Sequence, residues 1–471
     1  MSGGVDSAVA ALLLRRAGFD VFGIYMHNWD AGDEAGGSGA GACTSERDLQ
    51  DANAVAKKLR LPLLEADFVG RYWQDVFSGF LAGVAAGVTP NPDISCNAAI
   101  KFGALWEFAT RQGADVLATG HYARLGRPAA SGACAGSSGG DGSGGCGAAV
   151  EPLGGMEAWA AGAGAAAPPL LLRGADASKD QSYFLAGVSG AQLAHAMFPL
   201  GGMLKLDVRA LAAAEGLQPA AKRSSAGICF IGRRSFGSFI EQYIPQLPGR
   251  FLCADTGADL GPCANVLALT HGQRAPLGGG PQRRFIAGKD VAARVVWVAA
   301  GNDHPALMSA AALLAPARWV AGAPPGALLG GGGGGGGGRL ACECQPRYRQ
   351  EAVSCVVTDA ESAGAAGGAD AELHASAEPL RPSRFMGGAA GMAAAARVLV
   401  PQSGGAAAAP GGGGAGLLRL ASARPLRGLA PGQAVVLYDG PVVLGSAPLI
   451  APGETQFELE AAAGAAHPFG P

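Results

Sequence analysis

The stretch that most constrains this chain is Ser2-Gly3-Gly4-Val5-Asp6-Ser7, which runs directly into the apolar residues 8–17. Glycines permit a tight turn in which consecutive backbone N–H groups, two hydroxyls and a helix N-terminus converge on an anion such as phosphate. The stretch lacks the Lys-Ser/Thr pair of a Walker loop, and Asp6 is a candidate ligand for the magnesium ion of a nucleotide. The simpler alternative is a turn in which Asp6 or Ser7 caps a helix.

The hexapeptide resembles the signature loop of the ATP pyrophosphatases, which split ATP between its α and β phosphates and leave AMP on a substrate oxygen. The resemblance implies adenylation but does not name the substrate. In those enzymes a strand leads into the loop, as parallel α/β architecture requires, whereas only Met1 precedes the loop here. We therefore expect that the sequence begins late and that a first strand, with any targeting peptide, is missing.

Composition bounds the domain organisation. The 471 residues suggest two or three domains, but 78 of them are glycines, and the glycines cluster. Residues 131–168, 322–338 and 360–416 are rich in Gly, Ala and Pro without periodicity, so we expect flexible insertions that bury little surface. The net charge of −2 neither requires nor excludes a nucleic-acid partner. Lys222-Arg223 and similar basic pairs are candidate phosphate contacts, although scattered arginines are more often solvated surface.

Cysteine usage and hydropathy point to a soluble protein in a reducing compartment. The ten cysteines include no C-x-x-C pair, which argues against a zinc ribbon. Cys342 and Cys344 alternate on a predicted strand, where we expect core thiols. No run of 18 apolar residues occurs, so no membrane span is expected.

Short apolar runs alternate with helical patterns in the N-terminal third. Strands are predicted at 21–25, 63–66 and 115–118, and helices at 45–59 and 99–111. This alternation indicates a parallel sheet. Ligands of such sheets lie beyond the carboxyl ends of the strands, where residues 2–7, 26–28 and 119–121 are expected to meet.

The pattern changes after residue 204. A helix is predicted at 208–216, followed by the segment 222–232 that contains Cys229. From about residue 249 the strands are short, alternating and broken by glycine, as at 294–299, 347–357 and 434–444. This pattern is typical of a β-barrel.

Two cysteines have neighbourhoods that suggest chemistry. Cys96 lies in a loop stiffened by two prolines, and Asp93 can share a helical turn with its sulfur and transfer protons. Cys229 lies in a glycine-containing loop with basic residues upstream, which favours a thiolate of nucleophilic or sulfur-carrying character. A structural thiol is an equally good interpretation of each from these surroundings alone.

Five motifs together resemble the tRNA-specific 2-thiouridylases, in the order found in that family. They are residues 2–7, 89–93 with Cys96, 118–122, 179–185 and 227–232. Residues 271–274, 301–305, 347–350 and 431–433 extend the match over nearly all the chain outside the insertions. Residues 224–226 read Ser-Ser-Ala instead of the usual acidic-Ser-Thr, and 275–280 replace a more regular glycine-rich run, which affects fine positioning.

The resemblance assigns roles to individual residues. The nucleotide site falls on Ser2, Gly3, Gly4, Val5, Asp6, Ser7, Met26 and Gly120, with Asp6 also the magnesium candidate. Contacts to tRNA fall on Asn91, Pro92, Asp93, His121, Lys179, Asp180, Gln181, Arg347, Tyr348 and Gln433, the first three of which form the target-base loop. Cys96 matches the nucleophile, Cys229 the persulfide cysteine, and Asp93 is the third catalytic residue.

The implied reaction is ATP-dependent 2-thiolation of the wobble uridine, position 34, which gives 2-thiouridine, AMP and diphosphate. Adenylation turns the C2 oxygen into a leaving group. A persulfide on Cys229, refilled by a cysteine desulfurase or sulfur-relay protein, supplies sulfur, and Cys96 releases it and ends in a disulfide with Cys229. The base must leave the anticodon stack. The implied acceptors are the tRNAs for Lys, Glu and Gln.

The resemblance also implies an architecture. It comprises an α/β parallel-sheet domain of the adenine nucleotide α-hydrolase type at 1–198, a small central domain at 199–250 that carries Cys229, and a β-barrel-like tRNA-binding domain at 251–455, with a tail at 456–471. A mitochondrion or plastid is the expected location in a eukaryote, and the cytoplasm in a bacterium.

Two other functions remain open at this point. One is another PP-loop tRNA-modifying ligase, which needs no cysteine pair. The other is an inactive, truncated relative that only binds RNA.

Overall fold

The computed structural model describes residues 1–29, 44–128, 150–152, 168–222, 235–278, 282–329, 338–360, 380–400 and 416–463. The chain divides into two compact units. The first unit comprises residues 1–78, 92–233 and 439–444, and the second comprises 79–91, 234–438 and 445–471. Cys229 lies outside the described residues. The division into three domains with boundaries at 198 and 250 stays a prediction.

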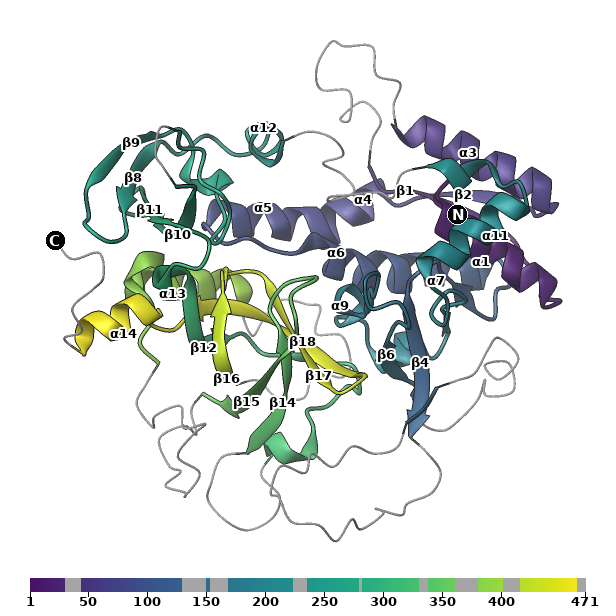
Figure 1. The fold of residues 1–471 in the computed structure, drawn as a ribbon. Coiled ribbons are helices and arrows are strands. Elements are labelled where there is room, and N and C mark those ends of the chain that lie inside the picture. The colour runs from purple at the N-terminus through teal and green to yellow at the C-terminus, as the bar shows by residue number, and fades with distance from the viewer. Residues whose placement is uncertain are drawn as a thin grey trace, which may run out of the picture. The chain divides into compact units, whose positions relative to one another are not determined.

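The first unit begins with the glycine loop and helix α1 (Val5–Arg16) (Figure 1). Gly3 has a φ of +67°, and a Cβ there would lie 2.1 Å from the carbonyl oxygen of Asp48 in helix α3 (Thr44–Leu59). Only glycine therefore allows the loop to approach α3 this closely. The apolar side of α1 packs into a core with helix α11 (Lys205–Ala214). This packing fixes the loop at the start of α1.

Parallel strand pairing in the first unit is confirmed. Strand β1 (Gly23–His27) pairs in parallel with β2 (Leu63–Asp67), and β3 (Leu117–Ala118) pairs in parallel with β7 (Ala196–Met197). The pairs form two separate two-stranded sheets. Strand β1 lies two residues beyond the predicted range because its pairing with β2 begins at Gly23. Helix α3 matches the prediction, and its face with Ala52, Ala56 and Leu59 is buried.

Residues 92–111 form one continuous helical segment. It consists of α6 (Pro92–Ser95), a π-helical stretch (Cys96–Ala104) and α7 (Leu105–Arg111). The predicted helix at 99–111 was therefore too short, and Cys96 lies within the helix instead of in the preceding loop. The reason is that Pro92 opens the helix, a position where a missing backbone N–H costs nothing.

The first unit also contains an antiparallel group, in which β4 (Ala123–Pro128) pairs with β5 (Val150–Pro152) and β6 (Leu170–Arg173). Strand β5 lies within the predicted insertion 131–168, so that prediction was wrong for these three residues. The remaining helices are α4 (Val69–Tyr72), a π-helical stretch (Trp73–Phe77), α9 (Ser182–Leu185), α10 (Gly190–Leu193) and a short helix at Gln218–Ala221.

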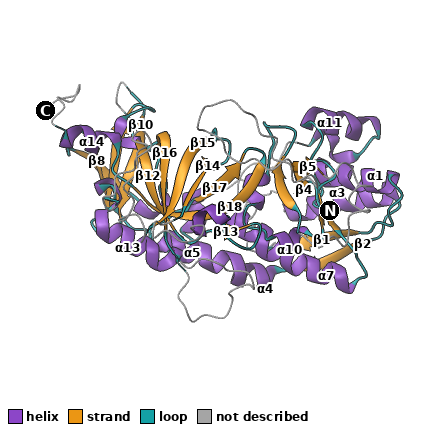
Figure 2. Ribbon diagram, turned by 90° about the horizontal axis from the view of Figure 1, so that it is seen from below, coloured by secondary structure: helices purple, strands orange, loops and turns teal. Residues whose placement is uncertain are grey.

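The second unit confirms the expected barrel. Strands β12 (Met308–Leu314), β16 (Leu418–Arg427), β15 (Val353–Asp359), β14 (Arg339–Gln345), β17 (Ala434–Asp439) and β18 (Val442–Pro452) follow one another, and β12 also pairs with β18 (Figure 2). That last pairing closes the sheet into a barrel. A second sheet has the order β10 (Arg284–Asp290), β11 (Val295–Ala300), β8 (Gly249–Cys253) and β9 (Asp259–Cys263). Short elements include α5 (Ser78–Ala85), α12 (Phe236–Ile240), β13 (Arg318–Trp319) and α14 (Gln456–Ala462).

Two of the predicted barrel strands, 347–357 and 434–444, begin or end at other residues in the structure. Residues 347–352 precede β15 without strand pairing, and the range 434–444 is a hairpin of β17 and β18. The hairpin turns at Gly440, whose φ of +54° suits a residue without a side chain. The core position predicted for Cys344 is confirmed, since it is fully buried, whereas Cys342 is half-buried. The Sγ atom of Cys342 lies 3.6 Å from that of Cys355 on β15.

Residues 380–400 correct the prediction that 360–416 is a featureless insertion. They contain a short helix (Arg384–Met386) and helix α13 (Gly388–Leu399). Phe385 is fully buried in a cluster with Phe457, and Trp297 packs against the same cluster. Small Gly and Ala residues obscured the pattern, because alanine is a strong helix former that carries little hydrophobic signal.

This packing leads to a testable expectation about the insertion. Phe385→Ala is expected to destabilise the second unit by about 3–5 kcal/mol, the usual cost of truncating a fully buried phenylalanine. Shortening 401–415 to a few residues is expected to leave stability nearly unchanged, because loop-closure entropy varies slowly with length. Urea unfolding of both variants measures this. A Phe385→Ala variant as stable as the unchanged protein would show that the packing of Phe385 does not support the unit.

Within the described ranges, no helix combines the length and the apolar character needed to cross a membrane.

Candidate functional site

The glycine loop has the geometry of an anion cradle. The hydroxyl oxygens of Ser2 and Ser7 lie 3.2 Å apart, and the Ser7 hydroxyl donates a hydrogen bond of 3.1 Å to the Gly4 carbonyl. Gly4 is the N-cap of α1 and provides no side-chain cap. The alternative in which Asp6 or Ser7 caps this helix is therefore wrong. Two hydroxyls and the start of a twelve-residue helix lie together, as phosphate binding requires.

Asp6 is engaged by two side chains from distant parts of the sequence. The ammonium group of Lys205, at the start of α11, lies 2.5 and 2.7 Å from its two carboxylate oxygens. The hydroxyl of Tyr122 donates to one of these oxygens at 2.8 Å. Burial and this hydrogen bond raise the pKa of Tyr122, so its hydroxyl keeps its proton.

The magnesium contact predicted for Asp6 stays a prediction. Both carboxylate oxygens already accept hydrogen bonds, and the nearest charge is a cation. Among the described residues, no group of three or more His, Cys, Asp or Glu side chains is arranged to hold a metal ion. We derive no step through a protein-bound magnesium ion.

The turn that follows β3 lies directly against the glycine loop. A Cβ atom at Gly120 would lie 2.8 Å from the backbone carbon of Asp6 and 2.9 Å from the Ser7 nitrogen. Any side chain at Gly120 would therefore displace the loop. The predicted meeting of residues 2–7 with 119–121 is confirmed. Met26 lies in β1 opposite Ala66, and its nucleotide contact stays a prediction.

His121 turns from this loop toward the helical segment that carries Cys96. Its ring centroid lies 6.2 Å from that of Phe102 and 6.0 Å from that of Phe198. Its Nδ1 atom and the Thr119 hydroxyl are 2.8 Å apart. Burial, and secondarily the positive charge of Lys101, hold the pKa of His121 well below its usual range. The imidazole is thus neutral, and any RNA contact it makes is a hydrogen bond and not an ion pair.

Cys96 and Asp93 both lie in this helical segment. Cys96 is only 5% exposed, and the neighbouring Asn97 anchors the helix by donating a 2.9 Å hydrogen bond to the Phe184 carbonyl. Burial raises the pKa of Asp93, although the charge of Lys101 opposes this shift. A carboxyl with a raised pKa can hold a proton where an exposed aspartate would have lost it. This suits a group that transfers protons.

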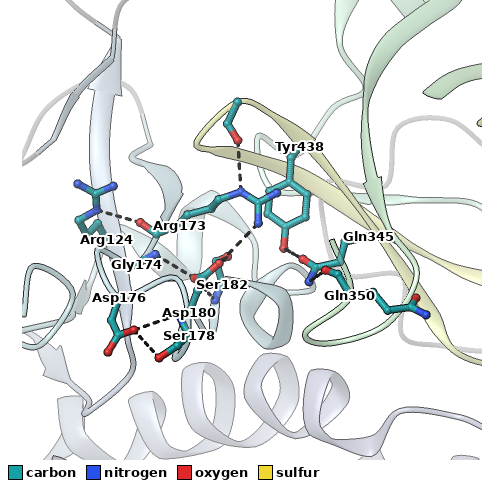
Figure 3. A network of polar contacts seen from close by, with 11 residues as sticks. Arg124, Arg173, Gly174, Asp176, Ser178, Asp180, Ser182, Gln345, Gln350 and Tyr438 are labelled. Carbon is teal, nitrogen blue, oxygen red and sulfur yellow. Dashed lines mark hydrogen bonds and ion pairs between the residues drawn. The ribbon is translucent and has the colours of Figure 1, made fainter. Parts of the chain in front are cut away.

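The segment 174–182 is held together by its own acidic side chains (Figure 3). One carboxylate oxygen of Asp180 accepts from the backbone nitrogens of Gly174 and Ser182, at 2.9 and 3.0 Å, and the other accepts from the Ser182 hydroxyl at 2.9 Å. Arg173 lies 3.7 Å from the same carboxylate. Asp180 thus organises the segment, while Lys179 and Gln181 are half-buried. The tRNA contacts of these three residues stay predictions.

Lys222 links the glycine loop to helix α3. Its ammonium group lies 2.6 Å from the carboxylates of both Asp48 and Asp51 on α3, and 3.0 Å from the Gly3 carbonyl. Burial lowers its pKa, but the hydrogen bonds and charges of the two aspartates outweigh burial and raise it. The sequence suggested a phosphate contact for Lys222, whereas the structure pairs it with two carboxylates.

In the second unit, the predicted RNA contacts are tied to backbone carbonyls. Arg347 donates a hydrogen bond to the His271 carbonyl. The guanidinium carbon of Arg349 lies 5.4 Å from the centroid of the Tyr348 ring. Gln433 donates a 2.7 Å hydrogen bond to the Thr89 carbonyl. Nearby, Tyr438 donates to Gln345, which donates to the Gln350 carbonyl (Figure 3). Asn91 is half-buried. RNA binding by these residues stays a prediction.

Three residues that contribute to the site were not predicted. Lys205 and Lys101 lie in helical stretches where a lysine normally indicates a solvated face. Tyr122 lies within a recognised motif, but nothing in its local pattern indicates that its hydroxyl reaches Asp6. Lys205 lies three residues before the predicted helix 208–216, and the structure places it at the start of α11, where a positive charge is unfavourable without an acidic partner.

The two units match two different domain models. Residues 1–233 match the tRNA methyl transferase HUP domain, and residues 415–449 match the aminomethyltransferase β-barrel domain. The chain thus combines an α/β nucleotide-binding domain with a barrel, in the arrangement of a family of tRNA-modifying proteins.

Whole-chain comparisons specify the family. The chain is 39% identical over 364 residues to the tRNA-specific 2-thiouridylase MnmA of Marinobacter nauticus, which covers 76% of this chain and 80% of the relative. It is 41% identical over 315 residues to proteins of the same name from Streptococcus pyogenes serotype M1 and Streptococcus agalactiae serotype III. Each of these alignments covers 66% of this chain and 73% of the relative. The chain belongs to the tRNA-specific 2-thiouridylase family.

Proposed function

We propose that this protein is a tRNA-uridine 2-sulfurtransferase that consumes ATP to thiolate C2 of the wobble uridine of tRNA. The observation that carries this proposal is the turn at residues 119–122. It touches the glycine loop through Gly120 and the helix of Cys96 through the ring of His121. The glycine loop and the helix that carries Cys96 thus both pack against this turn, which supports a reaction that combines activation with sulfur transfer. Family membership supports the same activity.

The glycine loop suits the first step of this reaction. The C2 carbonyl of uridine is a poor electrophile, so its oxygen attacks the α phosphate of ATP and displaces diphosphate. The loop would hold the departing diphosphate through Ser2, Ser7 and the start of α1. Met26 and Gly120 complete the proposed nucleotide site. ATP is the cosubstrate, and Asp6 is the candidate ligand for the magnesium ion that ATP carries.

Two cysteines provide the second step. A cysteine desulfurase or sulfur-relay protein converts the Cys229 thiol to a persulfide. The Cys96 thiolate attacks the inner sulfur of this persulfide, which forms a Cys96–Cys229 disulfide and releases hydrosulfide. The hydrosulfide adds to C2 and displaces AMP, which leaves 2-thiouridine. A thiol reductant then restores both cysteines.

Binding of the anticodon region is assigned to both units. Asn91, Pro92 and Asp93 would hold the extruded base. His121 and Lys179 to Gln181 would contact the RNA from the first unit, and Arg347, Tyr348 and Gln433 from the second. The proposed acceptors are the tRNAs for Lys, Glu and Gln.

Nucleotide products test the first step. Purified protein with cognate tRNA and a sulfur source is expected to yield AMP and diphosphate, together with 2-thiouridine detected by nucleoside mass spectrometry. Asp6→Ala is expected to lower the rate, because it removes the partner of the Lys205 ammonium group beside the loop. Asp20→Ala, at an exposed position of the same unit, serves as the control. Release of ADP and phosphate instead of AMP would refute the adenylation step.

A further inference from the structure

Asp6 is linked to the segment 174–182 by two separate hydrogen-bond paths. One path runs through Tyr122, whose backbone nitrogen donates to the Gln181 side-chain oxygen at 3.1 Å and whose carbonyl accepts from the Gln181 nitrogen at 2.8 Å. The Tyr122 hydroxyl then donates to Asp6 at 2.8 Å. A displacement of Gln181 therefore moves the residue that holds Asp6.

The second path runs through Lys205. Its backbone nitrogen donates to a carboxylate oxygen of Asp176 at 2.9 Å, and its ammonium group bonds both oxygens of Asp6. The other oxygen of Asp176 accepts from the nitrogen and hydroxyl of Ser178, at 3.0 and 2.7 Å (Figure 3). Asp176 thus joins the turn before Lys179 to the start of α11.

The linking residues are enclosed. Tyr122 is 3% exposed and Lys205 is 8% exposed. A Cβ at Gly174 would lie 2.6 Å from the Tyr122 carbonyl oxygen, so the backbone of Gly174 packs directly against that of Tyr122. Tightly packed groups of this kind transmit displacements instead of absorbing them.

We propose that Tyr122 and Lys205 are positioning residues that couple RNA binding at segment 174–182 to the glycine loop. This inference rests on the proposed function, since it takes Lys179, Asp180 and Gln181 as tRNA contacts. Binding of tRNA fixes the segment, the segment fixes Tyr122 and Lys205, and these set the position of Asp6 at the start of α1. ATP therefore binds more tightly when tRNA is present, and by linkage tRNA binds more tightly when ATP is present.

A coupling measurement tests the proposal. The Kd of α,β-methylene-ATP is measured by calorimetry with and without a saturating cognate tRNA transcript. The coupling ratio is the Kd measured without tRNA divided by the Kd measured with tRNA. For the wild type we expect a ratio within the usual allosteric range of about 5–150. Tyr122→Phe keeps the ring and both backbone bonds to Gln181 but removes the bond to Asp6. It is expected to reduce the ratio to less than a third of the wild-type value.

Two further variants separate coupling from stability. Lys205→Met leaves the Asp6 charge without its cation, whereas the double variant with Asp6→Asn removes both charges. The double variant is expected to recover the thermal stability lost in Lys205→Met while the ratio stays low. Lys58→Met, which removes an exposed ammonium group bonded to the Gly216 carbonyl, is expected to keep the wild-type ratio.

Each other outcome has a definite meaning. A wild-type ratio retained in Tyr122→Phe and in the double variant would overturn the proposal. So would weaker ATP binding by the same factor with and without tRNA, because that marks a contact without coupling. If the wild type thiolates tRNA but its Kd for α,β-methylene-ATP is the same with and without tRNA, the coupling proposal is refuted and the proposed function stands. A wild type that binds neither ligand would overturn both.

Discussion

Cys229→Ser is expected to form no 2-thiouridine and to take up no sulfur from a cysteine desulfurase, whereas Cys96→Ser is expected to form none but still to take up sulfur. The physical reason is access. Cys96 is 5% exposed within a continuous helical segment, so a protein donor cannot reach its sulfur. We therefore expect sulfur to enter at Cys229. Radiolabelled sulfur followed on denaturing gels, with mass spectrometry of the tRNA nucleosides, measures both properties.

Cys253→Ser is the matched control for this experiment. Cys253 is a half-buried free thiol in the second unit, and its substitution is expected to leave loading and thiolation unchanged. Label on Cys229→Ser but not on Cys96→Ser would reverse the two roles. Full turnover by either serine variant would remove the cysteine pair from the mechanism.

The local parts of the site followed from the sequence. The glycine loop and helix α3 are short-range features, because a turn or a helix face is determined by residues within a few positions of one another. The parallel pairing of β1 with β2 also followed, since strand, helix and strand in succession permit few arrangements. These are the parts that chain order alone determines.

The electrostatic parts of the site did not follow from the sequence. Asp6 was predicted to bind magnesium because a carboxylate beside a phosphate loop commonly does so. That contact stays a prediction, but the structure also pairs Asp6 with Lys205, which lies 199 positions away in the chain. Periodicity does not encode which charged side chains meet after folding. The same reason explains why Lys222, one of several candidate phosphate contacts in the sequence, is found with Asp48 and Asp51.

The π-helical stretch at Cys96–Ala104 shows a different limit. Its backbone departs from the 3.6-residue period, and the helix predicted at 99–111 overlaps the stretch but misses its start at Cys96. Such stretches are rare and frequently lie at functional sites. Here the irregular stretch begins at Cys96 itself.

Asp93→Asn is expected to load sulfur and still to bind tRNA, yet to thiolate about 10²–10⁴-fold more slowly, the usual contribution of a positioned proton-transfer group. Burial raises the pKa of Asp93, and Lys101 only partly opposes this. The carboxyl therefore stays protonated to a higher pH than an exposed aspartate, whose pKa is about 3.9. A proton donor is active below its pKa, so wild-type activity is expected to fall as pH rises through that raised value.

The asparagine side chain does not titrate, so the falling limb of the pH profile should be absent from Asp93→Asn. Single-turnover thiolation measured against pH, with sulfur loading and tRNA affinity measured separately, distinguishes lost proton transfer from lost binding. Asp115→Asn, at an exposed position in the same unit, is expected to retain the wild-type rate and profile. If Asp93→Asn kept the falling limb, another group would be the proton donor. A loss confined to tRNA affinity would instead limit Asp93 to holding the base.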